Sequence, residues 1–151
     1  MITIIAIGKK HEDWIQQGLE RYEKRLRRPF DVRWVLLPHS SLTGQEARQE
    51  ESERIEKQLK SGEYVVLLDE TGKILSSPAL SSLLHDTFSH SSHVTIIIGG
   101  AYGVNDNLRH KADFVWSLSH LVFPHQLVRL ILTEQLYRAQ AIAEGRAYHH
   151  D

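Results

Sequence analysis

The sequence contains no cysteine among its 151 residues. This absence excludes disulfide bonds, thiolate catalysis and cysteine-ligated zinc. A transition-metal site would therefore have to be built from carboxylates and the ten histidines. The densest histidine group, His85, His90 and His93, has neither the spacing of a helical pair nor that of a metalloprotease motif. We therefore expect no bound metal.

Long apolar runs are also missing. No stretch reaches the roughly 18 apolar residues that a membrane-spanning helix needs. The first residues, Met1 to Gly8, lack the basic start and the small-residue cleavage site of a signal peptide. We therefore expect a cytoplasmic protein with no membrane partner. The length and the lack of an internal repeat or linker predict one domain, residues 1–151, with its own core.

An excess of positive charge is missing as well, since the formal net charge is −1. Domains that bind nucleic acids usually carry surplus lysine and arginine, so any contact with RNA would be local. The candidates for such a contact are Lys24, Arg25, Arg27 and Arg28, with Lys9 and Lys10 nearby. The alternative interpretation, a solvated helix face, fits the same spacing.

The apolar residues that are present alternate between strand and helix patterns. Residues 2–7 form a run rich in β-branched side chains, which is typical of a strand covered on both faces. The residues Ile15, Leu19, Tyr22 and Leu26 then recur at helical spacing until Pro29. The same reasoning predicts further strands at 32–37, 64–69, 94–98 and 114–118, and further helices at about 45–60, 77–88, after Asn105, and 125–144.

The predicted boundaries follow from local signals. Ser77 before Pro78 predicts an N-cap with proline at the first helical position, and residues 70–73 predict a turn that ends the third strand. The charged helix at 45–60 can dock through Ile55 and Leu59 only. The repeated strand–helix order predicts an α/β fold with a mostly parallel sheet flanked by helices on both faces. Ligands of such folds bind outside the carboxyl ends of the strands.

Three junctions at predicted strand ends are candidates for a site: residues 68–70, 99–103 and 118–125. Paired glycines such as Gly99 and Gly100 let a ligand approach the backbone and leave amide groups free to bind it. The Gly-Gly-x-x-Gly spacing is neither the dinucleotide fingerprint nor a P-loop. It favours a nucleotide-like ligand, with a plain tight turn as the alternative.

The last predicted helix carries further polar candidates. Glu134 and Arg138 lie four residues apart and share a helix face, so the alternative to a functional role is a surface ion pair. Tyr137 and Tyr148 have packing as their alternative role, and His125 can be a plain first-turn residue of the helix.

Five ordered blocks together resemble a known family. They are Ile98-Gly99-Gly100-x-x-Gly103, Trp116-Ser117-Leu118-Ser119, Phe123-Pro124-His125-Gln126-Leu127-x-Arg129, Glu134-Gln135-Leu136-Tyr137-Arg138-Ala139 and Ala147-Tyr148-His149. With Ala6-Ile7-Gly8-Lys9 and Tyr22-x-Lys24-Arg25-Leu26 they span essentially the whole chain. The sequence thereby resembles the bacterial pseudouridine N3-methyltransferases of large-subunit ribosomal RNA.

The resemblance implies a SPOUT-class methyltransferase, in which the last third of the chain is threaded into a deep trefoil knot, a rare feature that periodicity cannot reveal. It also implies S-adenosylmethionine as methyl donor, 23S ribosomal RNA within the ribosome as substrate, and a homodimer whose active sites are completed near the partner subunit. By the same resemblance the donor contacts Leu68, Gly99, Leu118, Ser119, His120, Leu121, Val122 and Phe123.

Methyl transfer to an imide nitrogen requires removal of its proton and alignment with the sulfonium methyl group, so the protein mainly positions the reactants and assists deprotonation. We expect Glu134 or His149 to take or relay the proton, and Arg138 to hold a phosphate or the developing anion. The candidates for contacts with RNA are His125, Arg129, Tyr148 and His150.

The chain end departs from the family pattern, in which lysine or arginine follows the terminal Tyr-His. Here His150 and Asp151 follow, and because a histidine is largely neutral near pH 7, the tail's contact with phosphate is in doubt. The tail 146–151 leaves the helix after Gly145 and extends over at most about 20 Å, whereas the helix spans about 30 Å. To reach the donor pocket of its own chain, the tail would have to run almost straight back along the helix. We therefore expect the tail to reach the partner's donor pocket.

Two alternatives remain at this point: a non-catalytic nucleotide- or ribosome-binding protein, and a SPOUT enzyme that modifies another RNA such as tRNA. A near-neutral chain gains little from bulk electrostatics, so we expect it to prefer assembled ribosomal particles to bare RNA.

Overall fold

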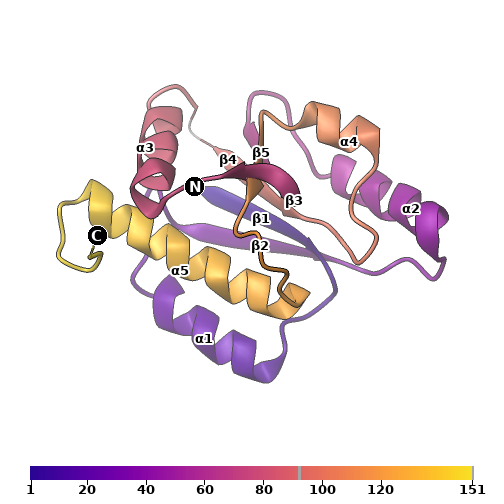
Figure 1. Cartoon of the computed structure of the whole chain (residues 1–151), viewed down its shortest axis with the longest axis horizontal. Helices are drawn as coiled ribbons and strands as arrows, with labels where there is room; N and C mark the ends of the chain where they lie inside the picture. Colours follow the sequence, from indigo (N-terminus) through magenta and orange to yellow (C-terminus); the bar gives the residue numbers. More distant parts are fainter. Residues whose placement is uncertain (92, 151) are drawn as a thin grey trace.

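The computed structural model describes residues 1–91 and 93–150 and contains a five-stranded sheet in which all neighbouring strands are parallel, in the order β2-β1-β4-β3-β5 (Figure 1). The strands are β1 (Ile2–Ile7), β2 (Val32–Leu37), β3 (Tyr64–Ile74), β4 (Val94–Ile98) and β5 (Phe114–Ser117). The helices are α1 (Asp13–Glu23), α2 (Gly44–Glu56), α3 (Ser77–Phe88), α4 (Asp106–Lys111) and α5 (His125–Ala143). The predicted α/β class is confirmed.

Helices cover both faces of the sheet, as predicted. Ile4 and Ile96 pack on one face with side chains of α1, α3 and α5, and Ile5 and Ile97 pack on the other face with side chains of α2 and α4. Successive side chains of a strand point to opposite faces, so the inner strands β1 and β4 are apolar except for the buried Thr3 and Thr95. The nearly continuous apolar runs in these strands follow from that double coverage.

The third strand is longer than predicted, because it continues through residues 70–73 to Ile74. Both Leu68 and Lys73 pair with Trp116 of β5, so the residues between them bulge out of the ladder. A Cβ atom added to Gly72 would lie 2.7 Å from the carbonyl oxygen of Val115, so glycine is required there. The turn signal in the sequence marks this bulge and not the end of the strand.

The N-cap of α3 is Ser76 and not Ser77. The Ser76 hydroxyl accepts a hydrogen bond from the backbone N–H of Ala79 at 3.1 Å. Ser77 instead donates to Gln135 Oε1 of α5 at 2.6 Å. Local sequence signals favour Ser77 as the cap, but its hydroxyl is engaged in this tertiary contact with α5.

Helix α2 docks through polar as well as apolar side chains. Ala47, Glu51, Ser52 and Ile55 are all buried. The Ser52 hydroxyl accepts from the backbone N–H of Asn105 at 2.9 Å, and Glu51 Oε2 accepts from that of Ser40 at 2.9 Å. The prediction that α2 docks through apolar residues only was therefore wrong, because backbone donors of two loops bind the buried Ser52 hydroxyl and one carboxylate oxygen of Glu51.

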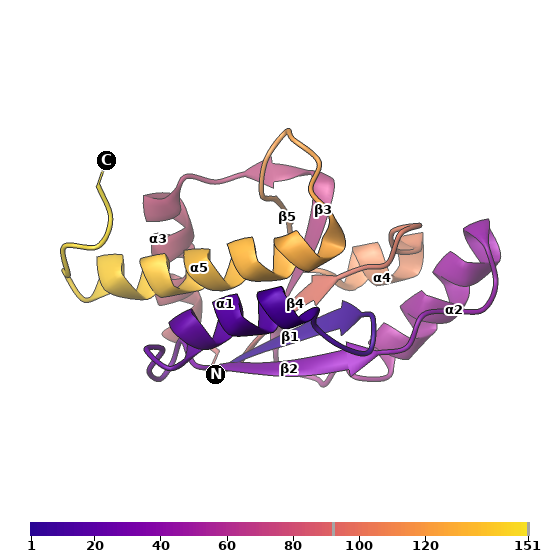
Figure 2. The same ribbon diagram turned by 90° about the horizontal axis from the view of Figure 1, so that it is seen from below.

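The strand order places β3 between β4 and β5, so the three candidate junctions meet at one edge of the sheet. Helix α5 begins beside this edge and runs away from it, and the C-terminal tail lies at its far end (Figure 2). No helix within 1–91 and 93–150 is long and apolar enough to cross a membrane.

Candidate functional site

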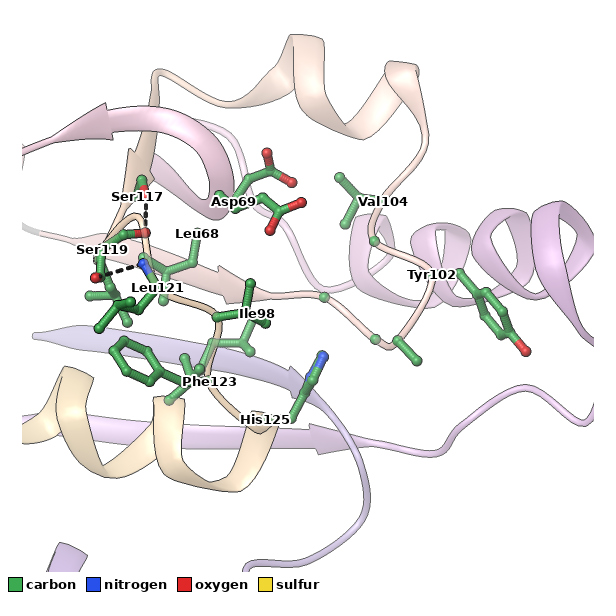
Figure 3. A pocket seen from close by; sticks show the side chains of 18 of the residues that line it. Leu68, Asp69, Ile98, Tyr102, Val104, Ser117, Ser119, Leu121, Phe123 and His125 are labelled. Atoms are coloured by element: carbon green, nitrogen blue, oxygen red, sulfur yellow. Dashed lines mark hydrogen bonds between the residues drawn. The ribbon is translucent and has the colours of Figure 1, made fainter.

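A cavity of about 590 Å³ lies beside the bulge of β3 and the carboxyl ends of β4 and β5 (Figure 3). Its lining includes seven of the predicted donor-binding residues, namely Leu68, Gly99, Leu118, Ser119, Leu121, Val122 and Phe123. The predicted substrate residue His125 also lines it, whereas the predicted donor residue His120 does not. The parallel sheet therefore gathers residues from three separate junctions into one pocket.

The loop after β5 is shaped by hydrogen bonds between its own serines. The Ser117 hydroxyl donates to the carbonyl oxygen of Ser119 at 2.9 Å, and the Ser119 hydroxyl accepts from the backbone N–H of Leu121 at 2.9 Å. This turn leaves Leu121 and Val122 exposed at 71% and 79%. Two apolar side chains in water beside a cavity provide a surface that a flat apolar ligand can cover.

The glycine-rich junction is both a tight turn and a wall of the pocket. The backbone N–H of Gly103 donates to the carbonyl oxygen of Gly100 at 3.0 Å. A Cβ atom on Gly99 would lie 3.0 Å from Val104 Cγ1, and one on Gly100 would collide with the carboxylate of Glu51. A side chain is thus excluded at Gly100 and crowded at Gly99, and the backbone forms the surface that a ligand meets.

Titratable groups stand on two sides of the pocket. Desolvation opposes ionisation of Asp69, but hydrogen bonds from Thr71 and Arg109 outweigh it and lower the pKa of this carboxyl group. Partial desolvation and the nearby guanidinium group of Arg129 lower the pKa of His125, which favours the neutral imidazole. A neutral imidazole can both donate and accept a hydrogen bond to a ligand.

Arg129 is 1% exposed, which does not fit its predicted contact with RNA. Its Nη2 donates to the carbonyl oxygens of Ile7 at 3.1 Å and Gly8 at 3.2 Å, and its Nη1 donates to that of Lys10 at 3.1 Å. These carbonyls belong to the carboxyl end of β1 and the loop after it. Arg129 therefore anchors this loop beside His125.

The three predicted catalytic residues come together on α5 and the tail. Arg138 donates to both carboxylate oxygens of Glu134, from Nε at 3.1 Å and from Nη2 at 3.2 Å. Nη1 of Arg138 lies 3.1 Å from Nδ1 of His149, and the guanidinium lies 4.8 Å from the centre of the Tyr148 ring. We call Glu134, Arg138, Tyr148 and His149 the α5 cluster.

The surroundings of the α5 cluster also fit the alternative roles, an ion pair for Glu134 and Arg138 and packing for Tyr148. The predicted ion pair between Glu134 and Arg138 forms, and the Tyr148 ring packs edge-on against Tyr137 at 4.8 Å between ring centres. His150 is exposed beyond the cluster, and Asp151 lies outside the described residues. None of these residues lines the pocket. His125 and Arg138 are separated along α5 by about 20 Å.

Sequence reasoning missed several residues of the pocket. Arg48 reaches it from α2 and donates from Nε to the carbonyl oxygen of Tyr102 at 2.9 Å. Val104 and Val128 also line it and lie outside the predicted junctions. Glu70 and Tyr102 lie inside the predicted junctions 68–70 and 99–103, but neither was singled out as a contact residue. In the described part of the chain, no group of three or more metal-ligating side chains could hold a metal ion.

Comparison with known proteins places the chain in a family. The family model described as "Predicted SPOUT methyltransferase" matches residues 1–149. The "Ribosomal RNA large subunit methyltransferase H" of Acetivibrio thermocellus is 45% identical over 98% of both chains. Proteins with the same name from Ruminiclostridium cellulolyticum and Methylobacillus flagellatus are 39% and 35% identical, over 98% and 99% of both chains. The chain therefore belongs to the SPOUT family of methyltransferases.

Proposed function

We propose that this enzyme transfers the methyl group of S-adenosylmethionine to N3 of a pseudouridine in 23S ribosomal RNA. The observation that carries the proposal is the gathering of Leu68, Gly99 and the loop 118–123 around one pocket. The names of the relatives support ribosomal RNA of the large subunit as the substrate. Membership of the SPOUT family implies the predicted trefoil knot in the last third of the chain.

The pocket fits the donor chemically. Leu68, Ile98 and Phe123 offer apolar contacts to an adenine ring, and the backbone at Gly99 and Gly100 lets a ligand approach closely. The bound donor supplies an activated methyl group, so the chain itself has to bind, orient and exclude water. The exposed side chains of Leu121 and Val122 would close over the pocket and keep water from the reacting atoms.

The α5 cluster provides the groups for the acceptor base. Glu134 holds Arg138 by a bidentate ion pair, which directs the remaining guanidinium donor towards His149. Arg138 can bind a phosphate or the anion that forms on the base, and Glu134 or His149 takes or relays the proton of the imide nitrogen. The Tyr148 ring offers a stacking surface to an RNA base.

A homodimer would unite the two halves of the site, because one chain keeps the α5 cluster and its own pocket apart. Half-buried apolar side chains of α5, Leu127, Leu130 and Ile131, form a stripe on the same helix as Glu134 and Arg138. Trp14 of the neighbouring helix α1 is 56% exposed. A second copy of the chain that covers this apolar surface would bring the α5 cluster of one subunit to the pocket of the other.

The decisive experiment measures methyl transfer from radiolabelled donor to large ribosomal subunits and to protein-free 23S RNA. We expect the assembled particles to be methylated at least about tenfold faster, because a near-neutral protein needs a shaped surface for affinity. Equal rates on both substrates would contradict this preference.

Mass spectrometry of ribosomal RNA from a deletion strain tests the target. Loss of one methyl group from a large-subunit pseudouridine supports the proposal. Unchanged RNA would favour the non-catalytic alternative, and a methyl group missing from tRNA would favour another substrate.

Substitution of Gly99 tests the donor pocket. In Gly99→Val the Cβ atom and its methyl groups would crowd Val104, whose Cγ1 lies 3.0 Å from the Cβ position. We expect the affinity for S-adenosylmethionine to fall about tenfold or more, with Gly99→Ala in between, while both variants stay folded at the assay temperature. Calorimetric titration measures the affinity of the wild type and of each variant for S-adenosylmethionine. Undiminished affinity in Gly99→Val would remove this residue from the site.

A further inference from the structure

Two adjacent carboxylates at the bulge of β3 line the pocket but differ in their partners. Asp69 lies 2.8 Å from Nη2 of Arg109 and also accepts hydrogen bonds from Thr71, so its charge is compensated. Glu70 is exposed and lines the same pocket. Within 1–91 and 93–150, the carboxylate of Glu70 has no hydrogen-bond or ion-pair partner. The pocket therefore holds one negative charge that the fold itself does not neutralise.

The pocket also carries nitrogen groups. In Figure 3, Asp69 and His125 lie at opposite sides of the pocket. His125 contributes an imidazole whose neutral form is favoured. Arg48 contributes a guanidinium group whose Nε is already bound to the carbonyl oxygen of Tyr102. The pocket thus presents an uncompensated carboxylate from β3 and a guanidinium group from α2. Such an arrangement favours a ligand that carries both a positive and a negative charge.

We propose that Glu70 determines specificity for the charge of the ligand, so that the pocket prefers S-adenosylmethionine to its demethylated product, S-adenosylhomocysteine. The inference rests on the proposed function, because it takes the pocket to be the donor site. Asp69 contributes little to this preference, since Arg109 already compensates its charge.

The chemistry of the reaction supplies the difference that Glu70 would sense. The bond between sulfur and the methyl carbon breaks, and its electron pair stays on sulfur, which changes from a cationic sulfonium to a neutral thioether. The new bond to carbon uses the electron pair of the base nitrogen, whose proton has been removed. The donor therefore carries one positive charge more than the product. A free carboxylate attracts the donor and releases the product.

The expected effect is moderate because the pocket is open to solvent. A charge pair several ångströms apart at a wet protein surface is screened by water and salt, which limits the preference to about three- to tenfold. Within this range the residue would still reduce inhibition by the product.

The test measures the dissociation constants of S-adenosylmethionine and S-adenosylhomocysteine by calorimetry, on the full-length protein and on Glu70→Gln. The glutamine keeps the shape and polarity of the side chain and removes only its charge. We expect the dissociation constant of the donor to rise about three- to tenfold and that of the product to stay within about twofold. Added salt should reduce the donor preference of the wild type but not that of the variant.

The matched control is Glu46→Gln, which removes the same charge from an exposed position of α2 that does not line the pocket. This variant should keep the wild-type ratio of the two constants. An equal change for both ligands in Glu70→Gln, or no change for either, would overturn the inference. If the wild type binds neither ligand, the proposed function fails instead, so the two failures are distinguishable.

Discussion

Mixed dimers of two impaired variants are expected to recover methyl transfer when one variant is damaged in the pocket and the other in the α5 cluster. Gly99→Val supplies the damaged pocket with an intact cluster, and Glu134→Ala supplies the reverse. Loss of an acid–base group typically lowers the rate about 10²- to 10⁴-fold, so Glu134→Ala alone should be nearly inactive. Gly99→Val alone should be slow when the donor concentration is kept well below its raised dissociation constant. A heterodimer contains one complete site if the pocket of one subunit works with the cluster of the other.

The measurement is the transfer rate on ribosomal particles after the two variants have been mixed and subunit exchange has been verified by mass spectrometry of differently labelled chains. The control mixes Glu134→Ala with a chain that lacks residues 146–151. Both lesions then lie in the α5 cluster, because the structure joins Glu134, Arg138 and His149 within one chain. This pair should stay inactive. Recovery in the control, or none in the first mixture despite exchange, contradicts the shared site.

Replacement of Arg129 by methionine is expected to destabilise the protein by about 3–5 kcal/mol. The buried guanidinium donates to the carbonyl oxygens of Ile7, Gly8 and Lys10. Methionine fills similar space but leaves these acceptors without a donor in the interior. Urea unfolding measures the loss as a lower midpoint with an unchanged slope.

The control for this prediction is Arg33→Met, which removes an exposed arginine from β2. A surface substitution of this kind should change stability by no more than about 0.5 kcal/mol. We expect Arg129→Lys to lie between the two, because an ammonium group cannot reproduce the planar fork of donors. A loss below about 1 kcal/mol in Arg129→Met would show that the loop after β1 does not depend on this side chain.

The sequence alone determined the class of the fold and the position of the pocket. Strands β1 and β4 were predictable because their β-branched runs leave no polar face, and a strand of that kind has to be covered on both sides. The helix α5 was predictable from its spacing, and its observed start at His125 is the predicted one. The pocket followed from a general rule, since the loops at the carboxyl ends of parallel strands meet at one edge.

Only the tertiary structure decided which residues touch. The burial of Arg129 depends on carbonyl groups far away in the sequence, at the end of β1. Ser76 caps α3 while Ser77, the predicted cap, bonds Gln135 of α5, and the bulge in β3 lies where that strand pairs with β5. The α5 cluster forms because the tail folds back onto its own helix, which separates Glu134 and His149 from the pocket of the same chain. Periodicity reports how each segment buries its own apolar side chains, whereas these contacts are set by the partners that strand order and helix packing bring near.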